Sequence, residues 1–153
     1  MNLDNTIQEM QVLGNNVTKE SKSILKRKNK TTRANTLHNE LDYLVTSNNT
    51  SVTLTFEFGK AKDYWMFVDE GVKGSGGFKG SGRMRGQGSP FRFRKKNIAK
   101  GVVEKWIANK PLKLRGTDGK FMAKTKNNIK SAAFLIGRAI AQRGLERTQF
   151  FSK

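Results

Sequence analysis

Residues 64–96 constrain the fold of this chain more than any other segment. The segment begins with an aromatic run, 64–68, which is apolar on both sides and fits either a buried strand or a short helical turn. Eight glycines follow between residues 71 and 88, and no acidic residue occurs between Glu70 and Glu104. Because glycine has little conformational preference, we expect neither a regular helix nor a regular strand there. The pattern predicts a scaffold element that leads into a long glycine-rich basic loop, residues 71–96.

The excess of positive charge is confined to the second half of the chain. The 153 residues carry a formal net charge of +18. Residues 1–70 contain nine acidic and nine basic residues, whereas residues 71–153 contain twenty-one basic residues and three acidic ones. Such an excess predicts a polyanionic partner, which is nucleic acid, an acidic protein surface or a membrane surface. The alternative is a solvated face that has no partner.

Composition argues against catalysis. The chain has no cysteine, and its only histidine is His38, so neither a zinc site built on these residues nor a histidine-based triad has its parts. The neighbouring carboxylates of Asp69 and Glu70 are expected to cap a turn or to pair with Lys or Arg. No apolar run approaches the ~20 residues that span a bilayer, and the N-terminal residues lack the basic stretch of a signal peptide. We expect an intracellular origin, no membrane contact, no enzyme activity, no metal and no cofactor.

The glycine-rich segment does not match the known phosphate-binding patterns. A dinucleotide fingerprint that starts at Gly74 and Gly76 would need a third glycine where Lys79 stands, and no P-loop pattern occurs. A flexible basic chain can instead follow phosphates without reading sequence, or it can contact neighbouring subunits. The cations expected to serve assembly or to face DNA are Lys73, Lys79, Arg83, Arg85, Arg92, Arg94, Lys95 and Lys96.

Hydrophobic periodicity predicts a helix and a hairpin before the loop. A seven-residue repeat in the N-terminal segment, 1–30, indicates a helix that packs on its own domain or on a neighbouring subunit. Gly14 weakens the middle of this helix and allows a break there. The stripe comprises Leu3, Met10, Val17 and Ile24, with Ile7, Leu13 and Leu25 beside it. A turn at Asn48-Asn49 and the alternation of apolar and polar residues over 52–58 predict a β-hairpin.

Two helices and a short tail are predicted after the loop. Residues 91–94 suit a short ordered return, with phenylalanines inward and arginines outward. The first helix would begin at an N-cap, Asn97, and bury one face. That face comprises Ile98, Val102, Trp106 and Ile107. The second helix would run from about Asn128 to Arg143, with Gly144 as its C-terminal cap. In the tail, 145–153, two aromatic residues, Phe150 and Phe151, need a dock on this subunit or on a partner.

Together these elements predict an α+β fold in a single domain, residues 1–153. A small antiparallel β-sheet would pack with the N-terminal helix and the two C-terminal helices, and the glycine-rich basic loop would project from it.

The order of these elements resembles the small neck proteins of tailed double-stranded DNA bacteriophages. That family comprises tail-completion or head–tail joining proteins, and the chain is especially similar to the ring proteins of crAss-like phages. The resemblance spans residues 30–151. Its anchors are Tyr64, Phe67, Val68, Asp69, Gly71, Trp106, Ile107, Gly144, Phe150 and Phe151. Most of these would be core residues, namely Tyr64, Phe67, Val68, Asp69, Gly71 and Trp106.

The resemblance implies a structural role in the virion. It implies an α+β subunit of a closed ring between portal and tail, through which genomic DNA passes, and it implies no catalysis. The family forms rings of six or twelve copies, and twelve matches the symmetry of phage portals. Partners would be further copies of the chain, the portal and tail proteins, and DNA in non-specific contact. The glycine-rich insertion is more basic here than in the family pattern. A sequence-independent nucleic-acid-binding protein that uses this loop is the alternative interpretation.

Overall fold

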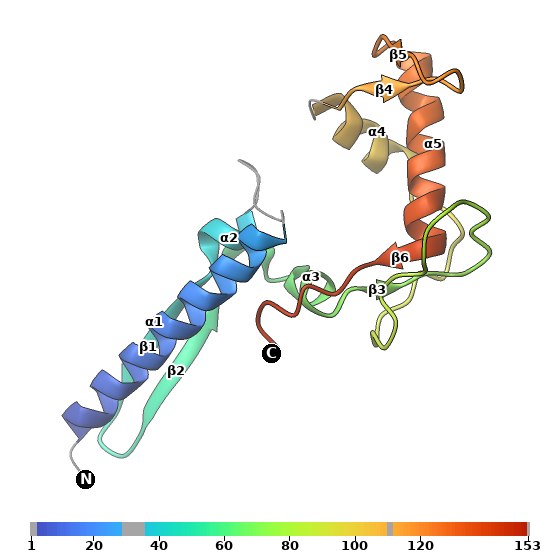
Figure 1. Cartoon of the computed structure of the whole chain (residues 1–153). Coiled ribbons are helices and arrows are strands. Elements are labelled where there is room, and N and C mark those ends of the chain that lie inside the picture. Colours follow the sequence, from blue (N-terminus) through green and yellow to red (C-terminus); the bar gives the residue numbers. More distant parts are fainter. Residues whose placement is uncertain (1–2, 29–35, 110–111, 153) are drawn as a thin grey trace. The chain divides into compact units, whose positions relative to one another are not determined.

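The computed structural model describes residues 3–28, 36–109 and 112–152. Two compact units make up the chain. The N-terminal unit comprises Met1–Glu70 and Arg147–Lys153, and the basic unit comprises Gly71–Glu146. The fold class is α+β as predicted, with an N-terminal helix, small antiparallel sheets and C-terminal helices (Figure 1). The assignment of the whole chain to a single domain stays a prediction. Pro111, which is expected to end the first of the two C-terminal helices, and most of the basic, apolar-free segment 26–33 lie outside the described residues.

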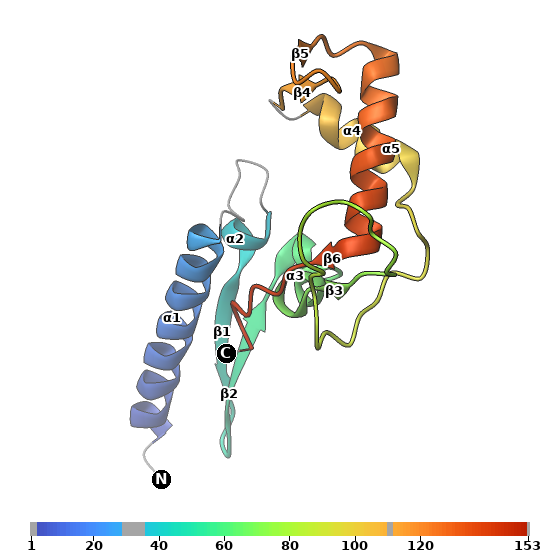
Figure 2. The same cartoon turned by 45° about the vertical axis from the view of Figure 1, so that its right-hand side comes forward.

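A long helix and a β-hairpin lie side by side in the N-terminal unit (Figures 1 and 2). The hairpin strands pair antiparallel in the register Asp42↔Glu57 to Ser47↔Val52. The side-chain Oδ1 of Asn48 accepts hydrogen bonds from the backbone N–H groups of Thr50 and Ser51, which confirms the predicted turn. The elements are α1 (Leu3–Arg27), α2 (Thr36–Glu40), β1 (Asp42–Ser47), β2 (Val52–Glu57), the 3₁₀ turn Gly59–Ala61 and α3 (Trp65–Glu70).

Helix α1 continues through Gly14 without the break that the sequence allowed. The hairpin approaches the helix closely at this residue, which explains the presence of a glycine. A Cβ atom on Gly14 would lie 2.7 Å from Cγ of Tyr43, so only glycine leaves room for the tyrosine ring. Gly14 itself is buried, whereas Leu13, which the periodicity placed beside the apolar stripe, is 49% exposed. The helix therefore packs on the hairpin of its own unit, which is the first of the two predicted alternatives.

The core of the N-terminal unit lies where α2, α3 and the tail meet the end of α1. Its buried side chains are Ile24, Leu25, Leu37, Leu41, Ala61 and Phe150. Of the two interpretations of the aromatic run 64–68, the helical turn is correct. A six-residue helix buries only one face, so Trp65 and Val68 pack against the core while Phe67 is 40% exposed. Tyr64 is 37% exposed, and the prediction that these two anchor residues are core was wrong.

The described residues of the basic unit form two helices and two strand pairs. Val103, Ile107, Leu114 and Ala133 make its main cluster. Half of the predicted inner face of the first helix was correct: Ile107 is buried and Ile98 packs against the cluster, whereas Val102 is 63% and Trp106 is 44% exposed. Val103, which was not predicted, points inward instead. The elements are β3 (Val72–Lys73), α4 (Lys100–Asn109), β4 (Leu114–Arg115), β5 (Phe121–Met122), α5 (Lys126–Arg143) and β6 (Gly144–Leu145).

Local capping signals set the ends of α5. Oγ1 of Thr125 accepts a hydrogen bond from the backbone N–H of Asn128 and thereby caps the helix N-terminus. Gly144 ends the helix at a φ of 91°, as its position in the sequence predicted. Helix α4 begins at Lys100, so Asn97 is not its N-cap. Among the described residues, no helix combines the length and the apolar character that crossing a membrane requires.

Replacing Gly14 with alanine should destabilise the N-terminal unit. Overpacking against Tyr43 costs about 1–3 kcal/mol, and we expect this cost to exceed the gain in helix propensity of about 1 kcal/mol. Gly101→Ala in α4 is the matched control, because a Cβ there has no heavy atom within 4 Å, and it should leave stability unchanged or raise it. Urea unfolding followed by circular dichroism measures both variants. A Gly14→Ala protein as stable as the wild type would contradict close packing between the helix and the hairpin.

Candidate polyanion-binding surface

The glycine-rich segment is held against the end of α5 by backbone hydrogen bonds. The N–H groups of Ser75, Gly76 and Arg85 donate to the carbonyl oxygens of Ala141, Gln142 and Arg143, over 2.9, 3.2 and 2.7 Å in that order. The last carbonyl groups of a helix have no partner inside it. Part of the glycine-rich segment therefore caps the C-terminal end of α5. The sequence predicted an arm with little preferred conformation and missed these contacts.

Several glycines of the segment are required by close backbone contacts. A Cβ on Gly74 would lie 2.6 Å from the carbonyl carbon of Arg143. One on Gly86, at a φ of +64°, would lie 2.5 Å from the carbonyl carbon of Val72. Gly76, at a φ of +90°, has open space around its Cβ position. The glycines thus differ in purpose, since some allow packing and others only provide a left-handed conformation.

The cations predicted to face a partner are all exposed in the basic unit. These are Lys73, Lys79, Arg83, Arg85, Arg92, Arg94, Lys95 and Lys96. Arg83 has an acidic neighbour, Glu146, at 3.9 Å, with side chains 87% and 55% exposed. Exposed ion pairs of this kind contribute little to stability. The charges of these side chains are therefore available to an anion from solution.

Residues 91–94 form the predicted short return. The backbone N–H of Lys73 donates to the carbonyl of Phe91, and the N–H of Phe93 donates to the carbonyl of Lys73. Phe91 and Phe93 are half-buried, while Arg92 and Arg94 are exposed. This pairing fixes two of the predicted cations on the outward side of a defined backbone.

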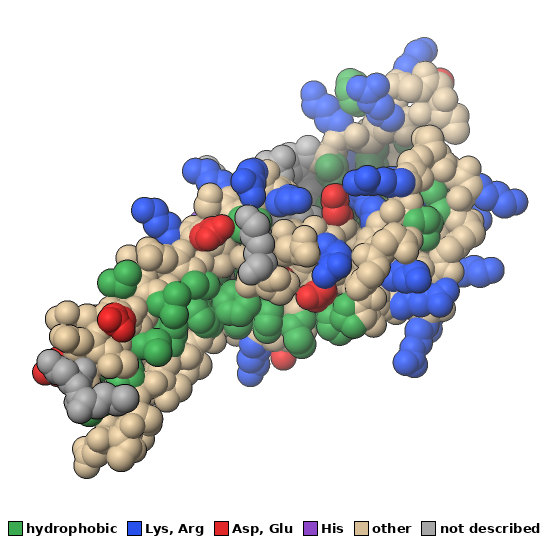
Figure 3. Space-filling model, turned by 60° about the horizontal axis from the view of Figure 1, so that its bottom comes forward, with side chains coloured by type: hydrophobic (Ala, Val, Ile, Leu, Met, Phe, Trp, Pro, Cys, Tyr) green, Lys and Arg blue, Asp and Glu red, His purple; other side chains and the backbone are tan. Residues whose placement is uncertain are grey.

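Charge is the chemical property that distinguishes the basic unit. Residues 71–146 contain nineteen basic and three acidic residues. Figure 3 shows Lys and Arg side chains standing out from the surface of this part of the chain. A dense set of exposed cations suits phosphate contacts that carry no sequence information.

One element of this surface was missed by sequence reasoning, which predicted no strand between the two C-terminal helices. Strands β4 and β5 form a hairpin, closed by hydrogen bonds between Gly116 and Lys120 and between Gly119 and Gly116. The ring of Phe121 is 59% exposed on this hairpin, with the Arg115 guanidinium carbon 4.6 Å from its centroid. The two glycines that flank Thr117-Asp118 were the available signal for a turn.

The carboxylates beside the aromatic run are structural, as predicted. Asp69 is 1% exposed, and its Oδ1 accepts a hydrogen bond from the backbone N–H of Phe151 at 2.9 Å. Glu70 pairs with Arg147 at 2.6 Å. Among the described residues, no three His, Asp or Glu side chains lie close enough together to hold a metal ion.

The aromatic tail docks on the N-terminal unit of its own chain. Phe150 is 2% exposed in the core. The ring of Phe151 packs edge-on against Phe56, Phe58 and Trp65, at centroid distances of 5.0, 5.4 and 5.6 Å. Of the two predicted docks, this subunit is the one found, so the buried Phe150 side chain is not presented to a partner.

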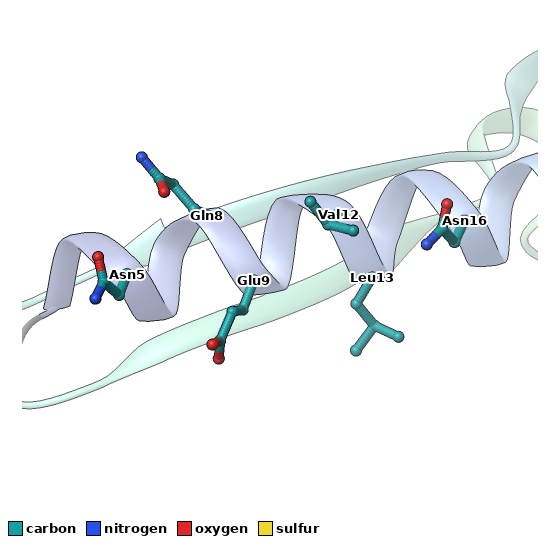
Figure 4. A pocket seen from close by; sticks show the side chains of 6 residues that line it. All are labelled: Asn5, Gln8, Glu9, Val12, Leu13 and Asn16. Carbon is teal, nitrogen blue, oxygen red and sulfur yellow. The ribbon is translucent and has the colours of Figure 1, made fainter.

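The outer face of α1 carries a shallow hollow without a convergent set of functional groups (Figure 4). Its lining residues are Asn5, Gln8, Glu9, Val12, Leu13 and Asn16. Figure 4 shows that these side chains follow one another along a single helix rather than pointing toward a common centre. The hollow contains one carboxylate, Glu9, and offers no acid–base pair.

Comparison with known proteins does not assign this chain to a group: no family model, curated protein or solved structure matches it. Its function must therefore be argued from the charge and geometry of its own residues.

Replacing Gly86 with alanine should loosen the contact between the glycine-rich segment and α5. Both Gly86 and Gly76 have a positive φ, so alanine strains the backbone at either position by about 1–2 kcal/mol. Only at Gly86 does the new methyl group also meet the backbone of Val72. Hydrogen exchange should show a larger decrease in protection at the Arg85 amide in Gly86→Ala than in Gly76→Ala. Equal effects of the two variants would mean that close packing is not what holds the segment.

Proposed function

We propose that this protein is a non-enzymatic structural subunit of a tailed-phage neck, which assembles into a ring between portal and tail. The observation that carries the proposal is the exposed excess of positive charge in the basic unit, which has nineteen basic against three acidic residues. The order of elements that resembles head–tail joining proteins supplies the biological setting. Its site of action would be the virion neck, after assembly in the host cytoplasm.

Electrostatics supports DNA as the neighbour of this unit. Duplex DNA carries one negative charge per ~1.7 Å of its axis, and basic side chains bind it by releasing counterions, whatever its sequence. In a cyclic assembly, every copy presents the same surface, so the excess of each subunit is repeated around the ring. Such a lining would hold a passing genome without fixing it at one sequence.

A free, sequence-independent nucleic-acid-binding protein is the second candidate, and the exposed cations of the glycine-rich segment favour it equally. The two functions differ in assembly. A neck subunit should form a closed oligomer, whereas a free module should bind DNA tightly as a monomer.

Native mass separates these candidates. Light scattering on the purified protein alone should give six or twelve times the chain mass of 17.2 kDa, or the protein should add that mass to the portal of the same phage when the two are mixed. A strict monomer that never joins the portal would contradict the ring. Tight duplex binding by such a monomer would then favour the second candidate.

Removing loop charges should weaken binding to duplex DNA. The double variant Lys79→Gln/Arg83→Gln should reduce the affinity for duplex DNA. The negative slope of log K against log [salt] should become shallower by about 0.9 for each phosphate that is no longer neutralised. Lys60→Gln/Lys62→Gln is the matched control, since it removes two exposed charges from the N-terminal unit. Fluorescence anisotropy with a labelled duplex at several salt concentrations measures both. Equal reductions of affinity in the two variants would show that duplex binding depends on the net charge of the chain and not on the location of that charge in the basic unit.

A further inference from the structure

The β4–β5 hairpin presents an aromatic ring and two cations on one face. Arg115 and Phe121 are cross-strand partners, and Lys113 precedes Arg115 by two residues, so all three share a side of the ribbon. The Arg115 guanidinium carbon lies 4.6 Å and the Lys113 ammonium nitrogen 5.3 Å from the centroid of the Phe121 ring. At these distances the cations interact with the π-system of the ring.

The opposite side of the hairpin is fixed to the helices. Leu114 is 7% exposed and belongs to the cluster with Val103, Ile107 and Ala133. Beyond the hairpin, Nζ of Lys124 donates to the carbonyl of Ile107 at 3.2 Å, and Nδ2 of Asn128 donates to the carbonyl of Ala123 at 2.8 Å. Because neighbouring residues of a strand point to opposite faces, burial of Leu114 directs Arg115 and its partner Phe121 outward.

Phe121 is the most exposed of the large aromatic residues that the structure describes. The side chain is 59% exposed, although burying apolar surface is worth roughly 25 cal/mol per Å². Cations beside an exposed aromatic ring are the combination by which proteins hold single-stranded nucleic acid: the ring stacks on a base and the cations contact the phosphates. In a duplex the faces of the bases are covered by neighbouring bases, so the Phe121 ring can stack only on an unpaired base.

We propose that Phe121, with Lys113 and Arg115, forms a stacking site for an unpaired nucleobase of single-stranded nucleic acid. The site differs from the proposed contact with duplex DNA, which needs only charge, and it does not depend on ring formation. An acidic protein segment would satisfy the two cations but would leave the exposed surface of the ring without a partner.

Binding of a labelled oligothymidylate and of a duplex of equal length tests the proposal. Phe121→Ala should weaken binding of the single strand about 5- to 150-fold, the range that corresponds to stacking of one base, and should leave duplex binding unchanged. Phe121→Trp should retain binding, and oligothymidylate should quench the fluorescence of the new tryptophan. Phe134→Ala is the matched control, because Phe134 is 43% exposed on α5 of the same unit and has no cation–π contact among the described residues.

Salt dependence separates stacking from charge. Phe121→Ala should keep the wild-type slope of log K against log [salt]. Lys113→Gln/Arg115→Gln should make this negative slope shallower by about 0.7 for each single-strand phosphate that is no longer neutralised. Polyglutamate, which has charge but no bases, should bind Phe121→Ala as well as it binds the wild type.

Three outcomes would overturn the stacking site. They are wild-type affinity of Phe121→Ala for oligothymidylate, an equal decrease in affinity for single strand and duplex, and weaker binding of polyglutamate by the variant. The last result would assign the surface to an acidic protein. Because duplex binding is measured in the same experiment, failure of the stacking site remains distinct from failure of the proposed DNA contact. Circular dichroism of each variant verifies that the fold is retained.

Discussion

Within each unit, backbone hydrogen bonds that join segments far apart in the sequence are the interaction on which the rest of the unit depends. In the N-terminal unit, the carbonyl groups at the end of α3 accept hydrogen bonds from Thr148 and Gln149. In the basic unit, β3 pairs with β6, and the glycine-rich segment caps α5. All these bonds join residues more than fifty positions apart, so each closes a long loop at a cost in chain entropy. They supply partners to carbonyl groups at the C-terminal ends of α3 and α5, which would otherwise have none.

This backbone framework explains how a unit with so many like charges can hold its shape. Its apolar cluster is small, and its exposed cations repel one another. Hydrogen bonds from Ser75, Gly76 and Arg85 do not depend on the charges, so the side chains can point outward while the backbone stays in place. A polyanion that binds only the folded unit would add stability by mass action. Stability and the proposed function are thus coupled through the same surface.

Sequence patterns predicted the elements whose signals are local. The alternation over 52–58 and the asparagine turn identified the hairpin, and Gly144 identified the end of α5. Burial was harder to predict. Trp106 was assigned to the core from helical periodicity and from the family resemblance, and Phe67 from the resemblance, yet each lies on the outer face of its helix. Which face of a short helix turns inward depends on the element it meets, and one helical turn of sequence does not contain that information.

The sequence by itself determined the α+β class and the separation of charge between the two parts of the chain, because periodicity, turn chemistry and composition are properties of neighbouring residues. Tertiary structure alone decided which glycines are indispensable, where Phe150 docks, and that Phe121 stands exposed beside two cations. Each of these depends on atoms from distant segments. Gly86 must be a glycine because the backbone of Val72 passes beside it. A contact of that kind cannot be recognised from the neighbouring residues in the sequence.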